Sequence, residues 1–167
     1  VGSRNQFCPG SAVYRDHVAA FVTALVERYA AHSAVAMWHV GNEFGQACFC
    51  DLCADRFRTW LEDRYGDLDG LNRAWGTAFW SQRYGAWREI VPPRTAPYVH
   101  NPTQLLDFRR FTSDQLRDVY RLQAEIIRAS SSRPSRPTRW ASSRSSTSSP
   151  GPTTSTSSPT TTTRTRR

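Results

Sequence analysis

The sequence predicts an α/β fold, and three observations support this prediction. Apolar positions recur at helical spacing from Val18 to Tyr29, and a tight link at His32-Ser33 follows them. The apolar run at residues 34–40 then has the length of a buried strand. A helix, a short link and a continuous apolar strand, in this order, are typical of proteins with a parallel sheet.

Two more helices and one long connection complete the predicted elements. Apolar positions over residues 53–65 predict a helix that ends at Gly66, where a C-cap glycine belongs. Residues 67–102 show little periodicity but gather aromatic side chains, which predicts an irregular, substrate-facing excursion. A last helix is expected over residues 102–129. Together these elements make up about one and a half βα units.

The composition changes abruptly at residue 130. Residues 130–167 contain 7 Arg, 13 Ser, 10 Thr and 5 Pro and no acidic residue. Because such a segment buries too little apolar surface to offset the entropy of ordering, we predict a disordered tail over 130–167 after a domain at 1–129. All basic residues of the chain are Arg, a bias typical of a GC-rich gene, so we interpret the tail as a product of a shifted reading frame. A natural Ser/Thr-rich linker or a glycosylated stalk is the alternative.

The net charge of +8 arises in this tail, since residues 1–129 carry 15 basic and 14 acidic side chains. The tail has one aromatic residue, Trp140, and lacks the interleaved aromatics that stack on bases, so no nucleic-acid partner is expected. No apolar run approaches the roughly 18 residues of a membrane span, and no secretion signal is visible. We therefore expect a cytoplasmic protein without a membrane partner.

The dipeptide Asn42-Glu43 directly follows the apolar run and is the first candidate for catalysis. A carboxyl group at the C-terminal end of a parallel strand lies on the face where α/β barrels assemble active sites. Retaining glycosidases use one carboxylic acid to protonate the leaving oxygen and a second carboxylate, about 5 Å away, as the nucleophile. A helix N-terminal or capping role for Glu43 is the more common explanation of an isolated Asn-Glu pair, so the dipeptide alone is weak evidence for catalysis.

Three thiols lie within six residues at Cys48, Cys50 and Cys53, and Cys8 supplies a possible fourth. Four thiolates suit tetrahedral zinc, with sulfur bonds of about 2.3 Å, and leave no position for water, so the predicted site is structural. Disulfides, buried free thiols or a redox-active Cys50–Cys53 pair are the alternatives. On its strand, His39 is expected to be packed or hydrogen-bonded in the core. The competing metal ligands are three histidines: His17, His32 and His39.

Several long motifs in a fixed order carry a resemblance to a known family. The longest are Trp38-His39-Val40-Gly41-Asn42-Glu43-Phe44-Gly45 and Leu71-Asn72-Arg73-Ala74-Trp75-Gly76-Thr77-Ala78-Phe79-Trp80-Ser81-Gln82. Shorter segments lie at residues 2–4, 8–9, 48–53, 64–66 and 106–111. Over essentially all of residues 1–129, the chain resembles the family-42 glycoside hydrolases, the microbial β-galactosidases.

The resemblance implies a fold and a set of site residues. It implies a partial (β/α)8 TIM barrel that runs from about the end of the third strand to the fourth helix. It makes Glu43 the general acid/base of a retaining β-galactosidase, and Asn42 the residue that holds the sugar's 2-hydroxyl group. Arg4 would lie beside the bound galactose, and Trp80 would line the substrate pocket while Trp75 packs in the core.

The resemblance also implies a cofactor, a partner and a limit. Family members with the cysteine cluster bind structural Zn2+ at the positions of Cys8, Cys48, Cys50 and Cys53, and the family suggests a homotrimer. The substrate would be a β-galactoside. The nucleophilic carboxylate would lie beyond the recognisable sequence, so we expect an N-terminal catalytic-domain fragment that is inactive alone. The alternative is a non-catalytic zinc-binding interaction module with a basic disordered arm.

Overall fold

The computed structural model describes residues 7–42 and 44–137. Most of the described residues are helical. In chain order, the elements are α1 (Ala12–Tyr29), β1 (Trp38–Val40), α2 (Asp51–Tyr65), α3 (Leu68–Trp75), the 3₁₀ turns η1 (Phe79–Ser81) and η2 (Trp87–Glu89), α4 (Pro102–Ser130) and β2 (Ser135–Pro137).

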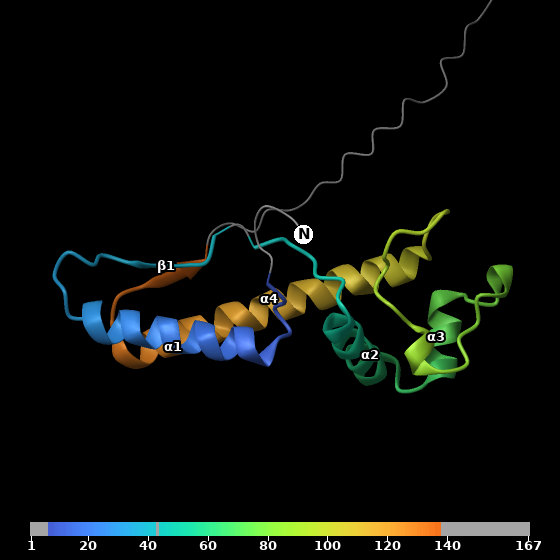
Figure 1. The fold of residues 1–167 in the computed structure, drawn as a ribbon, viewed down its shortest axis with the longest axis horizontal. Helices are drawn as coiled ribbons and strands as arrows, with labels where there is room; N and C mark the ends of the chain where they lie inside the picture. Colours follow the sequence, from blue (N-terminus) through green and yellow to red (C-terminus); the bar gives the residue numbers. More distant parts are fainter. Residues whose placement is uncertain (1–6, 43, 138–167) are drawn as a thin grey trace, which may run out of the picture.

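Helix α4 runs along the long axis of the molecule, and the other helices pack along it (Figure 1). Its 29 residues span about 44 Å at 1.5 Å per residue. Helix α1 lies along the C-terminal half of α4, whereas α2 and α3 pack near its N-terminal half (Figure 1). The described part of the chain is therefore elongated, with separate partners along the two halves of one long helix.

Two apolar cores correspond to these two halves. The larger core joins α2, α3 and the start of α4 through seven buried residues, Phe57, Leu61, Leu71, Trp75, Ile90, Phe108 and Phe111. The smaller core joins α1, β1 and the end of α4 through Val22, Val26, Val40 and Ile127. Each core buries one side of α4, which explains why apolar positions continue along the whole helix.

The two strands form a parallel pair with Trp38 opposite Ser135 and Val40 opposite Pro137. Because α2, α3 and α4 connect them, β1 and β2 are the strands of one crossover connection of the α/β type. The indole Nε1 of Trp38 also donates to Ser131 Oγ at 3.0 Å, which ties β1 to the end of α4. No helix among the described residues is long and apolar enough to cross a bilayer.

Local signals fix the helix ends. The hydroxyl of Ser11 accepts a hydrogen bond from the backbone N–H of Tyr14 and caps α1. Gly66, with φ of 76°, ends α2 at the predicted position. Asn101 caps α4, and Pro102 occupies its first turn, where a missing N–H leaves no bond unmade. All three predicted helices are present, and their C-terminal ends lie within one residue of the prediction. Helix α1 begins at Ala12, six residues before the first position of its apolar pattern.

Three expectations differ from the structure. The predicted strand at 34–40 shrinks to Trp38–Val40, because β1 pairs with β2 alone among the described residues and residues before it are mostly exposed. The prediction of a packed His39 is wrong, since its side chain is exposed. The connection 67–102, expected to be irregular, contains α3, which the capping Asp67 and the left-handed Gly76 delimit.

Order also continues past residue 129. Helix α4 ends at Ser130, and strand β2 lies inside the segment predicted to be a disordered tail. The backbone of β1 supplies the hydrogen-bond partners that order β2. The amino-acid composition of a segment does not show whether such a partner exists. The remainder of the predicted tail, residues 138–167, is outside the described part of the chain.

Candidate functional site

The four cysteines come together at the N-terminal ends of two helices. Cys8 precedes the turn that enters α1, and its carbonyl oxygen accepts a hydrogen bond from the Ser11 N–H at 3.0 Å. Cys50 is the N-cap of α2, and Cys53 lies buried in the first turn of that helix. Since the positive end of a helix dipole stabilises anions, the start of α2 favours thiolates at these positions.

The sulfur positions fit a tetrahedral metal ion. The Sγ atoms of Cys8 and Cys53 are 3.3 Å apart, those of Cys48 and Cys50 are 3.5 Å apart, and those of Cys50 and Cys8 are 3.6 Å apart. All four ligand atoms lie within 4.8 Å of one another. A zinc ion with bonds of about 2.3 Å requires sulfur separations of about 3.8 Å. The four thiols are free in the structure rather than bridged, which fits a metal site better than disulfides.

Burial and hydrogen bonding shift the pKa values of the thiols in different directions. Burial raises the pKa of the Cys8 and Cys53 thiols. Burial also opposes ionisation of Cys50, but hydrogen bonds from the backbone of Cys53 and from the thiols of Cys48 and Cys8 outweigh it and lower the pKa of Cys50. Cys50 therefore ionises more readily than Cys8 and Cys53. The three predicted competitor histidines are exposed and lie outside the four-residue group.

The predicted catalytic dipeptide follows β1 directly. Gly41 has φ of 67°, and a Cβ atom at this position would overlap the ring of Phe44, so glycine is required for the turn out of the strand. Asn42 comes next and is exposed. Glu43 and Arg4, the other two residues expected beside the sugar, lie outside the described residues. The described geometry thus places the amide at the carboxyl end of a parallel strand.

Trp80 occupies a strained and exposed position. Trp80 and Ser81 have φ of 58° and 55°, left-handed values that are costly for residues other than glycine. The Trp80 side chain is 63% exposed, and its ring lies 4.8 Å from that of Phe79 and 6.1 Å from that of Tyr98. Trp75, in contrast, is 4% exposed, so the expectation that it is a core residue is confirmed. Backbone strain that presents aromatic surface is typical of a binding position.

The structure does not bring all candidate residues into one place. The strand β1 and the turn η1, which carries Trp80, lie toward opposite ends of the long axis (Figure 1). The cysteines, by contrast, form a single cluster. Of the predicted site residues within 7–42 and 44–137, only the four metal ligands are therefore neighbours in this chain.

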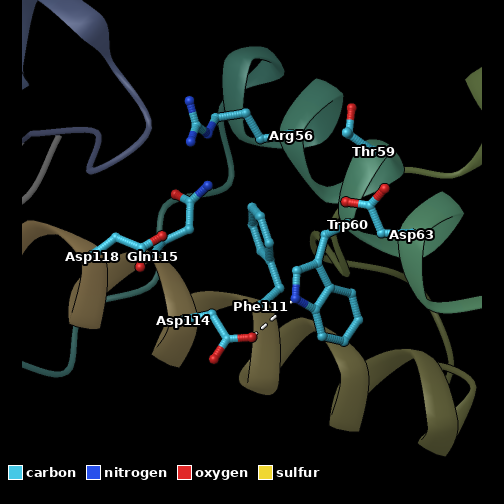
Figure 2. A pocket seen from close by; sticks show the side chains of 8 residues that line it. All are labelled: Arg56, Thr59, Trp60, Asp63, Phe111, Asp114, Gln115 and Asp118. Carbon is cyan, nitrogen blue, oxygen red and sulfur yellow. Dashed lines mark hydrogen bonds between the residues drawn. The ribbon is translucent and has the colours of Figure 1, made fainter.

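A pocket of about 370 Å3 lies between α2 and α4, and none of these candidate residues lines it. Its aromatic wall is formed by Trp60 and Phe111, and Trp60 Nε1 donates to Asp114 Oδ2 at 3.0 Å (Figure 2). Sequence reasoning did not find this pocket, because its polar residues are dispersed over two helices. Its lining residues are Arg56, Thr59, Trp60, Asp63, Phe111, Asp114, Gln115 and Asp118.

Comparisons with known proteins give one consistent result. The model of glycoside hydrolase family 42, described as Beta-galactosidase, matches residues 1–148. The β-galactosidase Bga of Halorubrum lacusprofundi is 51% identical over 131 residues, which are 76% of this chain and 19% of that protein. A β-galactosidase of Thermus thermophilus is 48% identical over 132 residues, 77% of this chain and 20% of that protein.

Solved structures agree. The structure of the Halorubrum lacusprofundi β-galactosidase superposes with a TM-score of 0.73 at 50% identity, covering 78% of this chain and 20% of that one. The β-galactosidase of Bacillus circulans sp. alkalophilus gives a TM-score of 0.75 at 37% identity, with 82% and 21% coverage. The chain spans about a fifth of the length of the relatives it matches.

The motif order, the strand that leads into Gly41-Asn42, the cysteine cluster and the family match over 1–148 agree with one another. The chain therefore belongs to the glycoside hydrolase family 42 β-galactosidases.

Proposed function

We propose that this chain supplies the acid/base part of a retaining β-galactosidase that hydrolyses terminal β-D-galactosides. The observation that carries this proposal is the position of Gly41-Asn42 at the carboxyl end of strand β1, with Glu43 next in the sequence, in a chain whose residues 1–148 match the family. Catalytic groups of α/β barrels gather at that end of their strands. The family relatives named above are β-galactosidases, and no observation favours a non-catalytic zinc-binding module.

Each predicted residue receives a chemical role in this proposal. The Glu43 carboxylic acid protonates the glycosidic oxygen as the bond to the anomeric carbon breaks, and a second carboxylate attacks that carbon to form a glycosyl-enzyme. Glu43, now ionised, then removes a proton from the water that releases galactose. Asn42 holds the 2-hydroxyl, whose hydrogen bond strengthens as positive charge develops in the ring.

Arg4 and Trp80 bind rather than react. The guanidinium of Arg4 has a fixed fork of donors that orients hydroxyl groups and a carboxylate. Trp80 presents an exposed indole that offers an apolar face to the sugar. The separation of η1 from β1 along the molecule means that further chain, or another copy, must complete the pocket around Trp80.

We further propose the partial (β/α)8 barrel as the context of these residues. Strands β1 and β2 would be neighbours in its parallel sheet, with α1 and α4 on the outside. The cysteine cluster would hold structural Zn2+ through Cys8, Cys48, Cys50 and Cys53, which ties the entry of α1 to the start of α2. The family's homotrimer and a cytoplasmic location remain proposals; free thiols suit a reducing compartment.

The domain division at residue 130 and the shifted reading frame also remain proposals. Their support is the Arg, Ser, Thr and Pro composition after Ala129, whereas the family match runs on to residue 148. Translation of the other two frames of the coding DNA tests them. A frame that yields an apolar strand after Ala129 supports the shift, and its absence from both frames rejects it.

The experiment for catalysis is a chimera. Residues 1–129 of this chain replace the matching segment of the Halorubrum lacusprofundi β-galactosidase, and hydrolysis of lactose and of dinitrophenyl β-galactoside is measured with Glu43 and with Glu43→Gln. We expect Glu43→Gln to lower lactose kcat by about 10²–10⁴-fold. The loss should be far smaller for the dinitrophenyl substrate, because that leaving group departs without protonation.

A matched control and a simple contrast complete the test. Glu62→Gln removes an exposed carboxylate from α2 and should leave both rates unchanged. The isolated 167-residue chain should hydrolyse neither substrate, since no acidic residue follows Ala129 to act as the second carboxylate. Equal losses on both substrates, or a chimera in which Glu43→Gln retains its lactose rate, would refute the acid/base role.

A further inference from the structure

Three arginines donate hydrogen bonds to the backbone that carries the cysteines. Arg15 Nε donates to Pro9 O at 3.1 Å, and Arg56 Nη1 donates to Gly10 O at 3.3 Å. These two carbonyls belong to the residues that follow Cys8. Arg94 Nε donates to Phe49 O at 2.9 Å, and Phe49 lies between Cys48 and Cys50. Both cysteine-bearing loops are thus held by guanidinium groups from elsewhere in the chain.

Arg94 contacts two residues of the loop that carries Cys50. Besides the bond to Phe49 O, its Nη2 atom lies 2.5 Å from Asp51 Oδ1, at the first residue of α2. One guanidinium therefore bonds to the residues on both sides of Cys50. The two partners of Arg94 are 45 and 43 residues away in sequence, so neither contact follows from local helical spacing.

The loop after Cys8 is shaped to admit Arg56. A Cβ atom at Gly10 would lie 2.6 Å from Arg56 Cδ and 3.3 Å from Gln115 Oε1, so a side chain at this position would displace the arginine. Arg56 stands at one end of the pocket between α2 and α4, opposite Gln115 (Figure 2). The small residue thus leaves the Gly10 carbonyl accessible to a guanidinium.

Charge gives the arrangement a second role. Four thiolates around one Zn2+ carry a net charge of −2, and nearby cations lower the free energy of such a centre. Arg15 is informative, because its Nη2 atom is buried and has no hydrogen-bond partner among residues 7–42 and 44–137. A buried cationic nitrogen without an acceptor is costly, and a negatively charged centre beyond the adjoining Cys8 loop reduces that cost.

We propose that Arg15, Arg56 and Arg94 form an outer shell that positions the two cysteine loops, and that the cations of Arg15 and Arg56 stabilise a doubly negative tetrathiolate metal centre. Asp51 largely compensates the charge of Arg94, which therefore acts mainly by holding the loop. The three arginines are positioning residues and do not bind the metal themselves. The inference rests on the metal site proposed above, and it assigns a function to three side chains that the hydrolytic mechanism does not use. The shell follows from the folded contacts, since Arg15, Arg56 and Arg94 share no sequence motif with the cysteines.

The test is the affinity of the 167-residue chain for zinc, measured by competition with a chromophoric chelator. We expect Arg94→Ala and Arg15→Ala each to weaken zinc binding by about 10-fold or more, the usual effect of losing an outer-shell contact. Arg83→Ala is the matched control. Arg83 also pairs with an aspartate at 2.5 Å, but that partner is the exposed Asp69 on α3, and zinc affinity should change by less than about twofold.

Two more variants separate charge from hydrogen bonding. Arg94→Lys keeps the charge and loses the fork, whereas Arg94→Gln keeps a donor and loses the charge; each should lie between wild type and Arg94→Ala. The Co2+-loaded proteins report geometry through their thiolate-to-metal absorption bands, and far-UV circular dichroism reports folding. Where an alanine variant does not fold, the Lys and Gln variants decide the matter.

The outcomes are distinguishable. Zinc affinities of the folded Arg15 and Arg94 variants within about twofold of wild type overturn the outer shell and leave the metal site standing. A wild-type chain that takes up no zinc overturns both the metal site and the shell. Neither result bears on Glu43, whose role is tested by the leaving-group comparison in the chimera.

Discussion

Asp107 is the most connected polar side chain among the described residues, and it is fully buried. Its Oδ2 atom accepts hydrogen bonds from Tyr65 Oη at 2.5 Å and from Trp75 Nε1 at 2.9 Å. Its Oδ1 atom lies 3.1 Å from Arg110 Nη1 and 3.6 Å from Arg64 Nε. One carboxylate thereby joins α2, α3 and α4, and its charge is compensated by two cations.

We expect Asp107→Ala to lower the free energy of unfolding by about 3–5 kcal/mol, because it leaves a half-buried phenol and a buried indole N–H without this acceptor and leaves Arg110 and Arg64 without their buried anion. Asp107→Asn keeps one oxygen for these donors and should cost less. Urea denaturation measures both. Asp69→Ala removes the exposed partner of Arg83 and should change stability by less than about 1 kcal/mol; a comparable loss there would argue against the importance of burial.

Tyr84 is expected to make stability depend on pH in alkali. Burial, followed by the negative charge of Glu89, raises the pKa of the Tyr84 phenol. The folded state therefore holds the proton more tightly than the unfolded state, so the contribution is present below the unfolded pKa of about 10 and is lost as the pH rises above it. Tyr84→Phe should flatten the fall of unfolding free energy above about pH 10. Tyr98→Phe, at a 73% exposed position, is the control and should leave the curve unchanged.

Sequence reasoning reached some residues and missed others for physical reasons. Trp75 was recognisable as core because its neighbours form a long motif, and the cluster Cys48, Cys50 and Cys53 was recognisable from its spacing. Asp107 lies in the motif segment 106–111, but the motif did not reveal its contacts, because its donors are 32 and 42 residues away in the sequence. Arg94 was missed for the same reason.

At the scale of elements, the start of α4 depends on one side chain. Asn101 Oδ1 accepts from the N–H groups of Thr103 and Gln104 at 2.9 and 3.3 Å, and Asn101 Nδ2 donates to Trp75 O at 2.8 Å. The Asn101 side chain therefore forms hydrogen bonds with backbone groups of both the first turn of α4 and the end of α3. This double use fixes the angle at which the long helix leaves the connection.

We expect Asn101→Ala to destabilise the chain by about 1–2 kcal/mol, since both the cap and the bond to α3 are lost. Asn101→Asp keeps the acceptor and loses the donor, so its cost should be smaller. Thermal unfolding followed by circular dichroism at 222 nm compares the two variants. An Asp variant as unstable as the Ala variant would show that the bond to Trp75, rather than the cap, controls the helix start.

The helices were predictable because their signals are local, whereas the strands were not. Apolar spacing located the C-terminal ends of α1, α2 and α4 within one residue, although α1 begins six residues before its apolar pattern. Strand β1 was overestimated and β2 was not expected, because a strand depends on a partner that lies far along the chain. Helix α3 is short, and its glycine at position 70 weakened the helical pattern.

At the scale of the whole molecule, two cores share α4 and little else. The core around Leu71 and the core around Val26 have no buried residue in common. The cysteine cluster joins the segment before α1 to the start of α2, and thus links the two halves by a second route. Metal binding should therefore strengthen the coupling between units that already share α4 and the Arg56–Gly10 contact.

Hydrogen exchange tests this coupling. Leu71 is fully buried, and Leu71→Ala should cost about 2–5 kcal/mol. In metal-free protein we expect this variant to accelerate exchange in α2 and α3 more than in α1, while Val26→Ala does the reverse. Zinc should reduce the difference in exchange rate between α1 and the pair α2 and α3. Equal acceleration of α1 and α2 by Leu71→Ala without zinc would mean that the chain unfolds as one cooperative unit.

The sequence predicted some features of the candidate site, while others depend on the fold. The residue types and their order predicted the family, which the match over 1–148 confirms. The roles of Glu43 and Arg4 stay predictions, since both residues lie outside the described part of the chain. Spacing predicted the three clustered thiols, and the turn before α1 brings in Cys8, 45 residues away from Cys53.

The left-handed backbone at Trp80 and Ser81 has an evolutionary consequence. Two such residues in succession cost about 1–2 kcal/mol each, and glycine would relieve that cost at either position. A library of this segment sorted for stability alone should accumulate glycine there and lose the indole. A library sorted for galactoside hydrolysis in the chimera should retain Trp80, so the difference between the two populations would measure how strongly function, rather than folding, preserves this residue.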